Sequence, residues 1–321
     1  MNITKLERYL GAMVGVLAGD AIGAPYENQK ASVIQADLLR RGGLVPFDYA
    51  DPWGKVRQMY AGQPTDDSEL AAALAESLIE HPEFDPEDLY NRLRDFIHSR
   101  NSILTDGVAY GSGGTLRKAL APLTYAKSLG KFKRDEIPSV PSNGSLMRCI
   151  AIPLCYRGHV DNLIEKAQRQ SAVTHVHPFA LAACTAYSIL VSGVLDELPP
   201  SRAWEMTKEI LSHVDSARYG MDKILETSVS EPREEEIWPR SGSVILSFRI
   251  ALWVSLTAVD FRDGITKAVS VGGDTDTYAA IAGGILGARF GIMGIPPEWR
   301  DVLIGREKME SFATRLYEIA N

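Results

Sequence analysis

The sequence contains few cysteines, no excess of positive charge and no long uninterrupted apolar run, and each absence excludes a class of protein. Three cysteines in 321 residues, with no CxxC spacing, cannot build a disulfide framework. The 34 Lys and Arg residues are outnumbered by 41 Asp and Glu residues, and this net charge of −7 argues against a nucleic-acid-binding protein that works by counterion release. The longest apolar runs, 244–258 and 279–295, are interrupted by Arg249 and Arg289 and are shorter than the roughly 20 residues that cross a bilayer. We therefore expect neither a nucleic-acid partner nor a membrane segment.

The composition itself is that of an ordinary globular protein. Hydrophobic residues make up 45% and charged residues 23% of the chain, which excludes disorder, collagen and coiled-coil arrays. Segment 1–13 carries charges where a signal peptide has its apolar core, and Cys149, Cys155 and Cys184 fit buried thiols in a reducing compartment, so we expect a cytoplasmic protein. No linker or internal repeat divides the chain. We expect a single domain over residues 1–321 and leave its oligomeric state open.

Apolar residues recur at helical spacing along most of the chain. Leu6, Leu10 and Leu17 follow this period, as do Leu70 and Leu74, whereas alternating strand patterns are nearly absent. The sequence therefore predicts an all-α protein, a compact bundle of ten or more helices. We expect helices at 144–156, 160–171, 201–214, 243–257, 262–271, 275–291 and 306–320, and long loops at 28–64, 125–143 and 229–242.

Two predicted helices carry stripes of small residues with a period of four. A glycine inside a helix costs about 0.5–1 kcal/mol relative to alanine, so such a stripe indicates that a neighbouring backbone approaches closely. Tight helix packing is the expected role of most of these residues. The stripes are Gly11, Gly15, Gly19 and Gly23 in one helix and Ala279, Gly283, Gly287 and Gly291 in the other.

Two clusters of Asp and Thr stand at predicted helix starts, and they are the main candidates for chemistry. One is Pro-Thr-Asp-Asp-Ser-Glu at 64–69 and the other is Gly-Gly-Asp-Thr-Asp-Thr at 272–277. A single Asp or Thr suffices for an N-cap, whereas each cluster offers several oxygen donors. Carboxylates packed together repel one another unless a hard divalent cation such as Mg²⁺ or Mn²⁺ neutralises them. The spacing alone leaves open a shared metal site or two independent caps.

Four segments resemble the ADP-ribosylglycohydrolase family, in the order and over nearly the whole length expected for it. Residues 15–27 resemble its opening G-x-x-x-G-D-x-x-G-x-x-x-E pattern, and 143–148 resemble its N-G-x-x-M-R segment. The two Asp/Thr clusters resemble its first and second metal motifs. The resemblance implies an orthogonal all-α helical fold and a hydrolase that removes ADP-ribose from an acceptor, an ADP-ribosylated protein or a small ADP-ribosyl compound, with two Mg²⁺ or Mn²⁺ ions.

Site residues carry over from the resemblance position by position. It implies metal ligands at Thr65, Asp66, Asp67, Asp274, Asp276 and Thr277. It implies catalytic roles for Glu27, Asp67 and Asp274 and substrate contacts from Asn143, Gly144, Ser145, Arg148 and His175.

Several of these residues also have a purely structural interpretation. Glu27 could be a surface carboxylate, Arg148 a structural ion-pair residue, and His175 and His177 a polar core or capping pair. The glycine-rich segment 111–114 lacks the preceding strand and the GK[ST] of a phosphate loop, so a helix entry is expected there.

The chain departs from the family pattern at two positions. Ser68 stands where Thr is common, and Ser142 stands where Gly is common before Asn-Gly. These departures favour the rival hypothesis of a non-catalytic ADP-ribose-binding or structural member, whereas retention of all six ligand-like residues argues against it. A metal-dependent phosphohydrolase is less well supported, because such sites usually add an HD pair and the chain has no His-Asp dipeptide. The acceptor linkage stays open.

Overall fold

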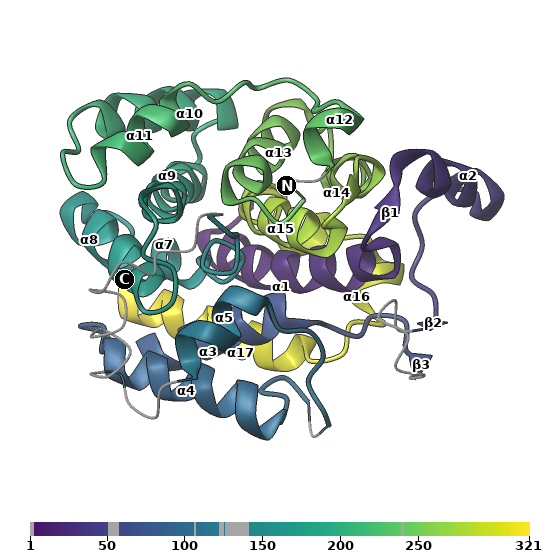
Figure 1. Ribbon diagram of the computed structural model, residues 1–321, viewed down its shortest axis with the longest axis horizontal. Helices are drawn as coiled ribbons and strands as arrows, with labels where there is room; N and C mark the ends of the chain where they lie inside the picture. The colour runs from purple at the N-terminus through teal and green to yellow at the C-terminus, as the bar shows by residue number, and fades with distance from the viewer. Residues whose placement is uncertain (1–2, 51–57, 106, 122–124, 126–140, 239–240) are drawn as a thin grey trace.

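The computed structural model describes residues 3–50, 58–105, 107–121, 125, 141–238 and 241–321, and regular structure there is almost entirely helical (Figure 1). The prediction of an all-α fold is confirmed. The N-terminal half contains α1 (Lys5–Gly23), η1 (Ala24–Tyr26), α2 (Ala31–Arg41), α3 (Asp66–Glu80), α4 (Pro86–Ser99), α5 (Gly114–Leu120) and α7 (Ala151–Tyr156). The C-terminal half contains α8 (Val160–Ala172), α9 (Pro178–Leu195), α10 (Pro200–Ser212), α11 (Arg218–Leu225), α12 (Glu234–Ile237), α13 (Val244–Thr257), α14 (Phe261–Ser270), α15 (Thr275–Phe290), η2 (Ile292–Gly294), α16 (Pro297–Arg300) and α17 (Arg306–Ala320).

Strands are confined to two short antiparallel pairs within the described ranges. In one pair β1 (Gln29–Lys30) lies against β4 (Gly272–Gly273), and in the other β2 (Tyr49–Ala50) lies against β3 (Gln58–Met59). The first pair joins segments more than 240 residues apart in the sequence, because Gln29 is the partner of Gly273. It fixes the chain that leaves α1 against the chain that enters α15.

Helices α1 and α15 run antiparallel at the centre of the molecule and are in backbone contact (Figure 1). A Cβ atom on Gly15 would collide with the carbonyl oxygen of Gly283, and one on Gly11 would collide with that of Gly287. A Cβ on Gly23 would meet the backbone of Thr275. The prediction that the stripes permit close backbone approach is therefore confirmed. Their consequence is that the C-terminal end of α1 lies beside the N-terminal end of α15.

The core around this helix pair is continuous. α9, α13 and α15 are apolar on nearly all sides and are almost entirely buried, as expected for helices at the centre of a bundle. α9 has the length and hydropathy of a membrane span, but 83% of it is buried inside the protein, as in the core helix of a globular protein. The three cysteines are buried and unpaired, as predicted.

Three predicted boundaries are wrong. The expected loop 28–64 contains α2, in which only Ile34 is buried; the helix ends before Gly42, whose φ of 76° is left-handed. The expected loop 229–242 contains one helical turn, α12. The expected helix 144–156 is helical only from Ala151, because Asn143 is held by backbone pairing with Gly242 and 144–150 form turns. The expected loop 125–143 lies largely outside the described residues.

Candidate metal centre

The two predicted metal motifs meet at the junction of α1, α3 and α15. Thr65, Asp66 and Asp67 begin α3, and Asp274, Asp276 and Thr277 begin α15. The charge of Asp274 raises the pKa of Asp67, and the charge of Asp67 raises the pKa of Asp276, so the two motifs lie close together. The structure therefore brings together all six ligand-like residues, whose motifs are about 200 residues apart in sequence.

Glu27 lies beside the second motif. One oxygen from each of Glu27, Asp274 and Asp276 lies within 4.8 Å of the other two, which is close enough for all three to contact one ion. The β1–β4 pairing explains this placement. Asn28, which follows Glu27, donates its N–H to the carbonyl of Gly273, which precedes Asp274 (2.7 Å). This position fits the functional interpretation of Glu27 better than that of an unrelated surface carboxylate.

Burial and mutual repulsion disfavour the charged forms of these carboxyl groups. Burial, followed by the charge of Asp20, raises the pKa of Asp66 to about 7. Burial and the neighbouring carboxylates raise the pKa values of Asp67 and Asp276 well above their usual range, and burial raises that of Asp274. Such an arrangement binds either protons or a cation.

The donor set fits a hard divalent cation. The Oδ1 atom of Asp67 is buried and has no hydrogen-bond partner among the described residues, so a ligand-capable oxygen is left unsatisfied. Carboxylate and hydroxyl oxygens are the ligands that Mg²⁺ and Mn²⁺ prefer, and no Cys or His of the described chain joins this group. The acidic cluster can therefore hold metal.

Asp20 organises the first motif, and the sequence assigned it no role. Its fully buried carboxylate accepts hydrogen bonds from the Thr65 N–H (3.0 Å), the Thr65 hydroxyl (2.7 Å), the Ser68 N–H (3.0 Å) and the Ser68 hydroxyl (2.5 Å). Asp20 thus caps α3 from another helix. The sequence signal that could have indicated this role is a charged residue directly after Gly19, in the middle of the buried small-residue segment of α1. The Ser68 hydroxyl donates to Asp20, so Ser at this position, where Thr is common in the family, still makes the contact through its hydroxyl.

Two further groups line the first motif from segment 100–112. Gly111, at φ 80°, lies directly against the Asp66 carboxylate and leaves no space for a side chain. Arg100 donates to the Gly111 carbonyl (2.8 Å), and its charge opposes the rise in the pKa of Asp66. The glycine-rich segment is a helix entry, since α5 begins at Gly114, as predicted.

Asn143 reaches the second motif directly. Its Nδ2 donates to Asp274 Oδ2 (2.7 Å) and to the Ser247 hydroxyl (2.9 Å). Gly144 follows in a tight contact, because a Cβ there would lie 3.0 Å from Cε1 and Nε2 of His175. Asn143, Gly144 and His175 thus form one continuous wall beside the acidic cluster.

Arg148 and Ser145 do not reach the cluster. Arg148 is fully buried, and its guanidinium donates to the side chain (3.0 Å) and backbone carbonyl (2.7 Å) of Gln170 and to the Thr174 hydroxyl (3.0 Å). Ser145 is also buried and accepts from the Ser171 hydroxyl (2.8 Å). Both side chains therefore have hydrogen-bond partners inside the protein, and their contact with substrate stays a prediction. Arg148 pairs with neutral acceptors rather than with the acid that its structural interpretation expects.

The two histidines have different positions. The His177 side chain caps α9 by accepting from the Phe179 N–H (3.1 Å), as the structural interpretation expects. His175 is buried and has hydrogen-bond partners at both ring nitrogens, the Thr174 hydroxyl (2.7 Å) and the Ser142 hydroxyl (3.1 Å). Burial, with the nearby Arg148 charge, lowers the pKa of His175 to about 3, so its ring is neutral.

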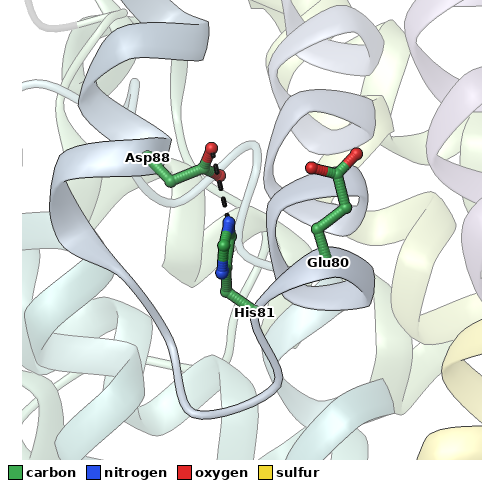
Figure 2. A group of neighbouring side chains, drawn as sticks. All are labelled: Glu80, His81 and Asp88. Carbon is green, nitrogen blue, oxygen red and sulfur yellow. Dashed lines mark ion pairs between the residues drawn. The ribbon is translucent and has the colours of Figure 1, made fainter.

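A second group with metal-compatible spacing, Glu80, His81 and Asp88, lies on the surface at the end of α3 and the start of α4 (Figure 2). His81 Nε2 is 3.8 Å from Asp88 Oδ1. Arg92 already neutralises both acids, with contacts of 2.5 Å to Glu80 and 2.7 Å to Asp88. This exposed group is therefore an ion-pair network, and it supplies surface acids as controls for the buried cluster.

Comparison with known proteins agrees with this geometry. A family model described as ADP-ribosylglycohydrolase matches residues 1–321. ADP-ribosylarginine hydrolase Tri1 of Serratia proteamaculans (strain 568) is 27% identical over 317 residues, covering 98% of this chain and 80% of that protein. The ADP-ribosyl-[dinitrogen reductase] glycohydrolase of Rhodospirillum rubrum is 24% identical, covering 91% and 89% of the two chains, and ADP-ribosylhydrolase ARH3 of Gallus gallus is 24% identical, covering 97% and 93%.

The fold agrees as well. A solved structure named as an ADP-ribosylglycohydrolase-related protein complex superposes with a TM-score of 0.70 and 28% identity, and the match covers 99% of both chains. The resemblance inferred from the four sequence segments is therefore confirmed over the full length. This chain belongs to the ADP-ribosylglycohydrolase family.

Proposed function

We propose that the protein is a metal-dependent hydrolase that cleaves the glycosidic bond between ADP-ribose and an acceptor, and that it releases free ADP-ribose. Family membership and the relatives named for hydrolysis of ADP-ribosyl groups support ADP-ribosyl hydrolysis. The observation that carries the metal-dependent form is the convergence of Asp67 with the Glu27–Asp274–Asp276 group, together with the buried Asp67 Oδ1, which has no hydrogen-bond partner in the part of the chain that the structure describes.

Two Mg²⁺ or Mn²⁺ ions would be held by the two motifs. Thr65, Asp66 and Asp67 would be ligands from α3, and Asp274, Asp276 and Thr277 would be ligands from α15. When bound, such ions supply Lewis-acid stabilisation and a bound water of lowered pKa.

The protein's own groups have separate roles in this mechanism. Glu27 lies beside Asp274 without belonging to either helix start, so it can take a proton from the attacking water or give one to the leaving acceptor. Asp274 lies close enough to Asp67 to raise its pKa, and these two carboxyls can share the base or acid role with Glu27. Hydrolysis at the anomeric carbon develops oxocarbenium-like positive charge, which these carboxylates stabilise. Asn143 orients Asp274, and His175 borders the same wall.

The substrate we propose is an ADP-ribosylated protein or a small ADP-ribosyl compound, with the acceptor joined through a nitrogen or oxygen. ADP-ribosyl-arginine is the first linkage to test, because two relatives are named as ADP-ribosylarginine hydrolases. We also keep the proposals of a single domain and a cytoplasmic location, which the composition supports.

The test is a panel of linkage-defined ADP-ribosyl substrates, containing arginine, serine and O-acetyl linkages, with Mg²⁺ or Mn²⁺ and product identification. Free ADP-ribose from at least one substrate is expected. Cleavage of the diphosphate instead would identify a phosphohydrolase, and tight ADP-ribose binding without turnover would identify a non-catalytic member. Glu27→Gln removes the acid or base but keeps an oxygen that can contact the ion, so it should abolish turnover while the protein still binds metal. The surface variant Glu80→Gln is its matched control.

A further inference from the structure

Four polar side chains form an unbroken hydrogen-bonded chain from the core to the half-buried Ser142. An Nη of Arg148 lies 3.0 Å from Thr174 Oγ1, which in turn lies 2.7 Å from Nδ1 of His175. Nε2 of His175 lies 3.1 Å from Oγ of Ser142. Arg148, Thr174 and His175 are all buried, so water cannot replace the contacts among these three without a structural change.

Elementary hydrogen-bond chemistry gives this chain a direction. A guanidinium only donates, so Thr174 Oγ1 accepts from Arg148 and has its single hydroxyl hydrogen left to donate. Among the described residues Nδ1 of His175 is the one acceptor within reach of this hydrogen, so a lone pair on Nδ1 is the arrangement that leaves no buried hydroxyl hydrogen without a partner. A neutral imidazole with a lone pair on Nδ1 carries its hydrogen on Nε2, and that hydrogen points to Ser142 Oγ. Ser142 then has its own hydroxyl hydrogen free to donate onward.

The buried charge of Arg148 polarises the whole chain. Its described partners are neutral: Gln170, Thr174 and the carbonyl oxygen of Gly144. Successive dipoles aligned by a cation strengthen one another in a low-dielectric interior, and each hydrogen points away from Arg148. The chain thus presents a strengthened hydrogen-bond donor at Ser142.

Ser142 lies at the edge of the acidic centre. It immediately precedes Asn143, whose Nδ2 is 2.7 Å from Asp274 Oδ2. Its backbone is fixed by antiparallel pairing with Ser243, with flanking bonds from the Val244 N–H to the Pro141 carbonyl (3.0 Å) and from the Asn143 N–H to the Gly242 carbonyl (3.2 Å). A polarised donor held rigidly beside a cluster of carboxylates is suited to an anionic oxygen that the carboxylates themselves would repel.

We propose that Ser142 donates a hydrogen bond to an anionic phosphate oxygen of the ADP-ribosyl substrate, and that Arg148 and Thr174 are positioning residues that fix the Nε2–H tautomer of His175. This inference rests on the proposed function for the identity of the ligand. It gives Ser142 a binding role that a glycine at this position cannot have. It also gives Arg148 an indirect influence on substrate, consistent with its complete burial.

The tautomer can be tested without substrate or turnover. In ¹⁵N-edited NMR of the wild-type protein, His175 should show a protonated Nε2 and an unprotonated Nδ1 at neutral pH. Thr174→Val removes the hydroxyl that enforces this state and should shift or mix the tautomers, whereas Thr174→Ser keeps the hydroxyl and should restore the wild-type signature. A wild-type Nδ1–H tautomer, or an unchanged signature in a folded Thr174→Val protein, would overturn the relay.

The binding role is tested by calorimetry with ADP-ribose and with adenosine, which lacks the phosphates. Ser142→Ala should raise the Kd for ADP-ribose by roughly tenfold or more, as expected for loss of a hydrogen bond to a charged group, and leave the Kd for adenosine unchanged. Thr174→Val should raise the Kd for ADP-ribose as Ser142→Ala does, and Thr174→Ser should leave this Kd at the wild-type value. An unchanged Kd for ADP-ribose in Ser142→Ala contradicts this inference alone, whereas no ADP-ribose binding by the wild type contradicts the proposed function as well.

Discussion

The carboxylate of Asp20 accepts two hydrogen bonds from Ser68, one from its hydroxyl at 2.5 Å and one from its backbone N–H at 3.0 Å, although the two residues are 48 positions apart. Two more come from Thr65. An acid inside α1 therefore sets the position of the first turn of α3, which carries Asp66 and Asp67. The orientation of these ligand residues depends on a contact that is invisible in either segment alone.

Replacing Asp20 by Asn should damage both stability and the metal centre. The amide cannot accept all four hydrogen bonds, and each buried donor left without a partner costs about 1–3 kcal/mol. Loss of ligand orientation should lower the affinity for Mn²⁺ by about 10- to 100-fold, as is typical of groups that hold metal ligands in place. Chemical denaturation and calorimetric Mn²⁺ titration measure the two effects.

Asp85→Asn is the matched control for this change, because Asp85 caps α4 through the Glu87 N–H (2.8 Å) away from the cluster. It should cost at most about 1 kcal/mol and leave Mn²⁺ affinity unchanged. If Asp20→Asn behaved like Asp85→Asn, Asp20 would be only a helix cap.

Gly15→Ala should destabilise the protein strongly. The added Cβ would collide with the carbonyl oxygen of Gly283 on α15, and a core that cannot relax loses about 1–3 kcal/mol or more on such overpacking. Gly114→Ala is the control, because a Cβ there meets open space and its φ is ordinary. Urea unfolding of both variants measures the difference, and equal stabilities would contradict the close approach of α1 and α15.

Metal should stabilise the protein more strongly as the pH rises. The folded-state pKa of Asp66 is about 7, above its ordinary value of 3.8, so this group favours the folded state when protonated and loses that contribution between about pH 4 and pH 7. A bound cation requires the deprotonated ligands and removes the penalty. The difference in Tm between protein with Mn²⁺ and protein with chelator should therefore grow from pH 5 to pH 8. A difference independent of pH would show that Asp66 does not face the bound metal.

Asp66→Ala and Asp274→Ala should each reduce metal affinity and ADP-ribose release together. Both carboxyls belong to the acidic cluster, and both have raised pKa values because desolvation penalises their charges. Glu80→Ala, on the surface beside Arg92, should change neither the metal affinity nor the ADP-ribose release. It should cost only a small amount of stability. A variant that retained full activity and full metal content would remove that residue from the ligand set.

The sequence indicated the candidate ligand residues more readily than the residues that hold them in position. The family resemblance implied that Thr65, Asp67 and Asp274 are ligands, whereas the oxygen donors at the two helix starts alone left open a shared site or two caps. The glycine stripes indicated that the helices beside these segments approach closely. Asp20 was assigned no role because its four partners lie on another helix. The complete burial of Arg148 could not be predicted, because a motif gives residue order and not the direction of a side chain.

The predicted element boundaries were wrong where the local sequence pattern and the tertiary contacts favour different structures. The apolar face of α2 is short, with Ile34 buried and Leu38 partly buried against the core, and Gly42 terminates the helix. Segment 144–150 has helix-like composition but is held in turns by the pairing of Ser142 and Asn143 with the segment before α13. The same pairing places Ser142 next to His175, which no periodicity could have indicated.

The most direct test of the central claim is ADP-ribose release by metal-stripped protein from ADP-ribosyl-arginine and the other linkages, with and without restored Mn²⁺ or Mg²⁺. The convergence of Asp66 and Asp67 with Asp274, Asp276 and Glu27 predicts no release in chelator and recovery when either ion is added back. Full release of ADP-ribose in excess chelator would contradict the metal-dependent mechanism.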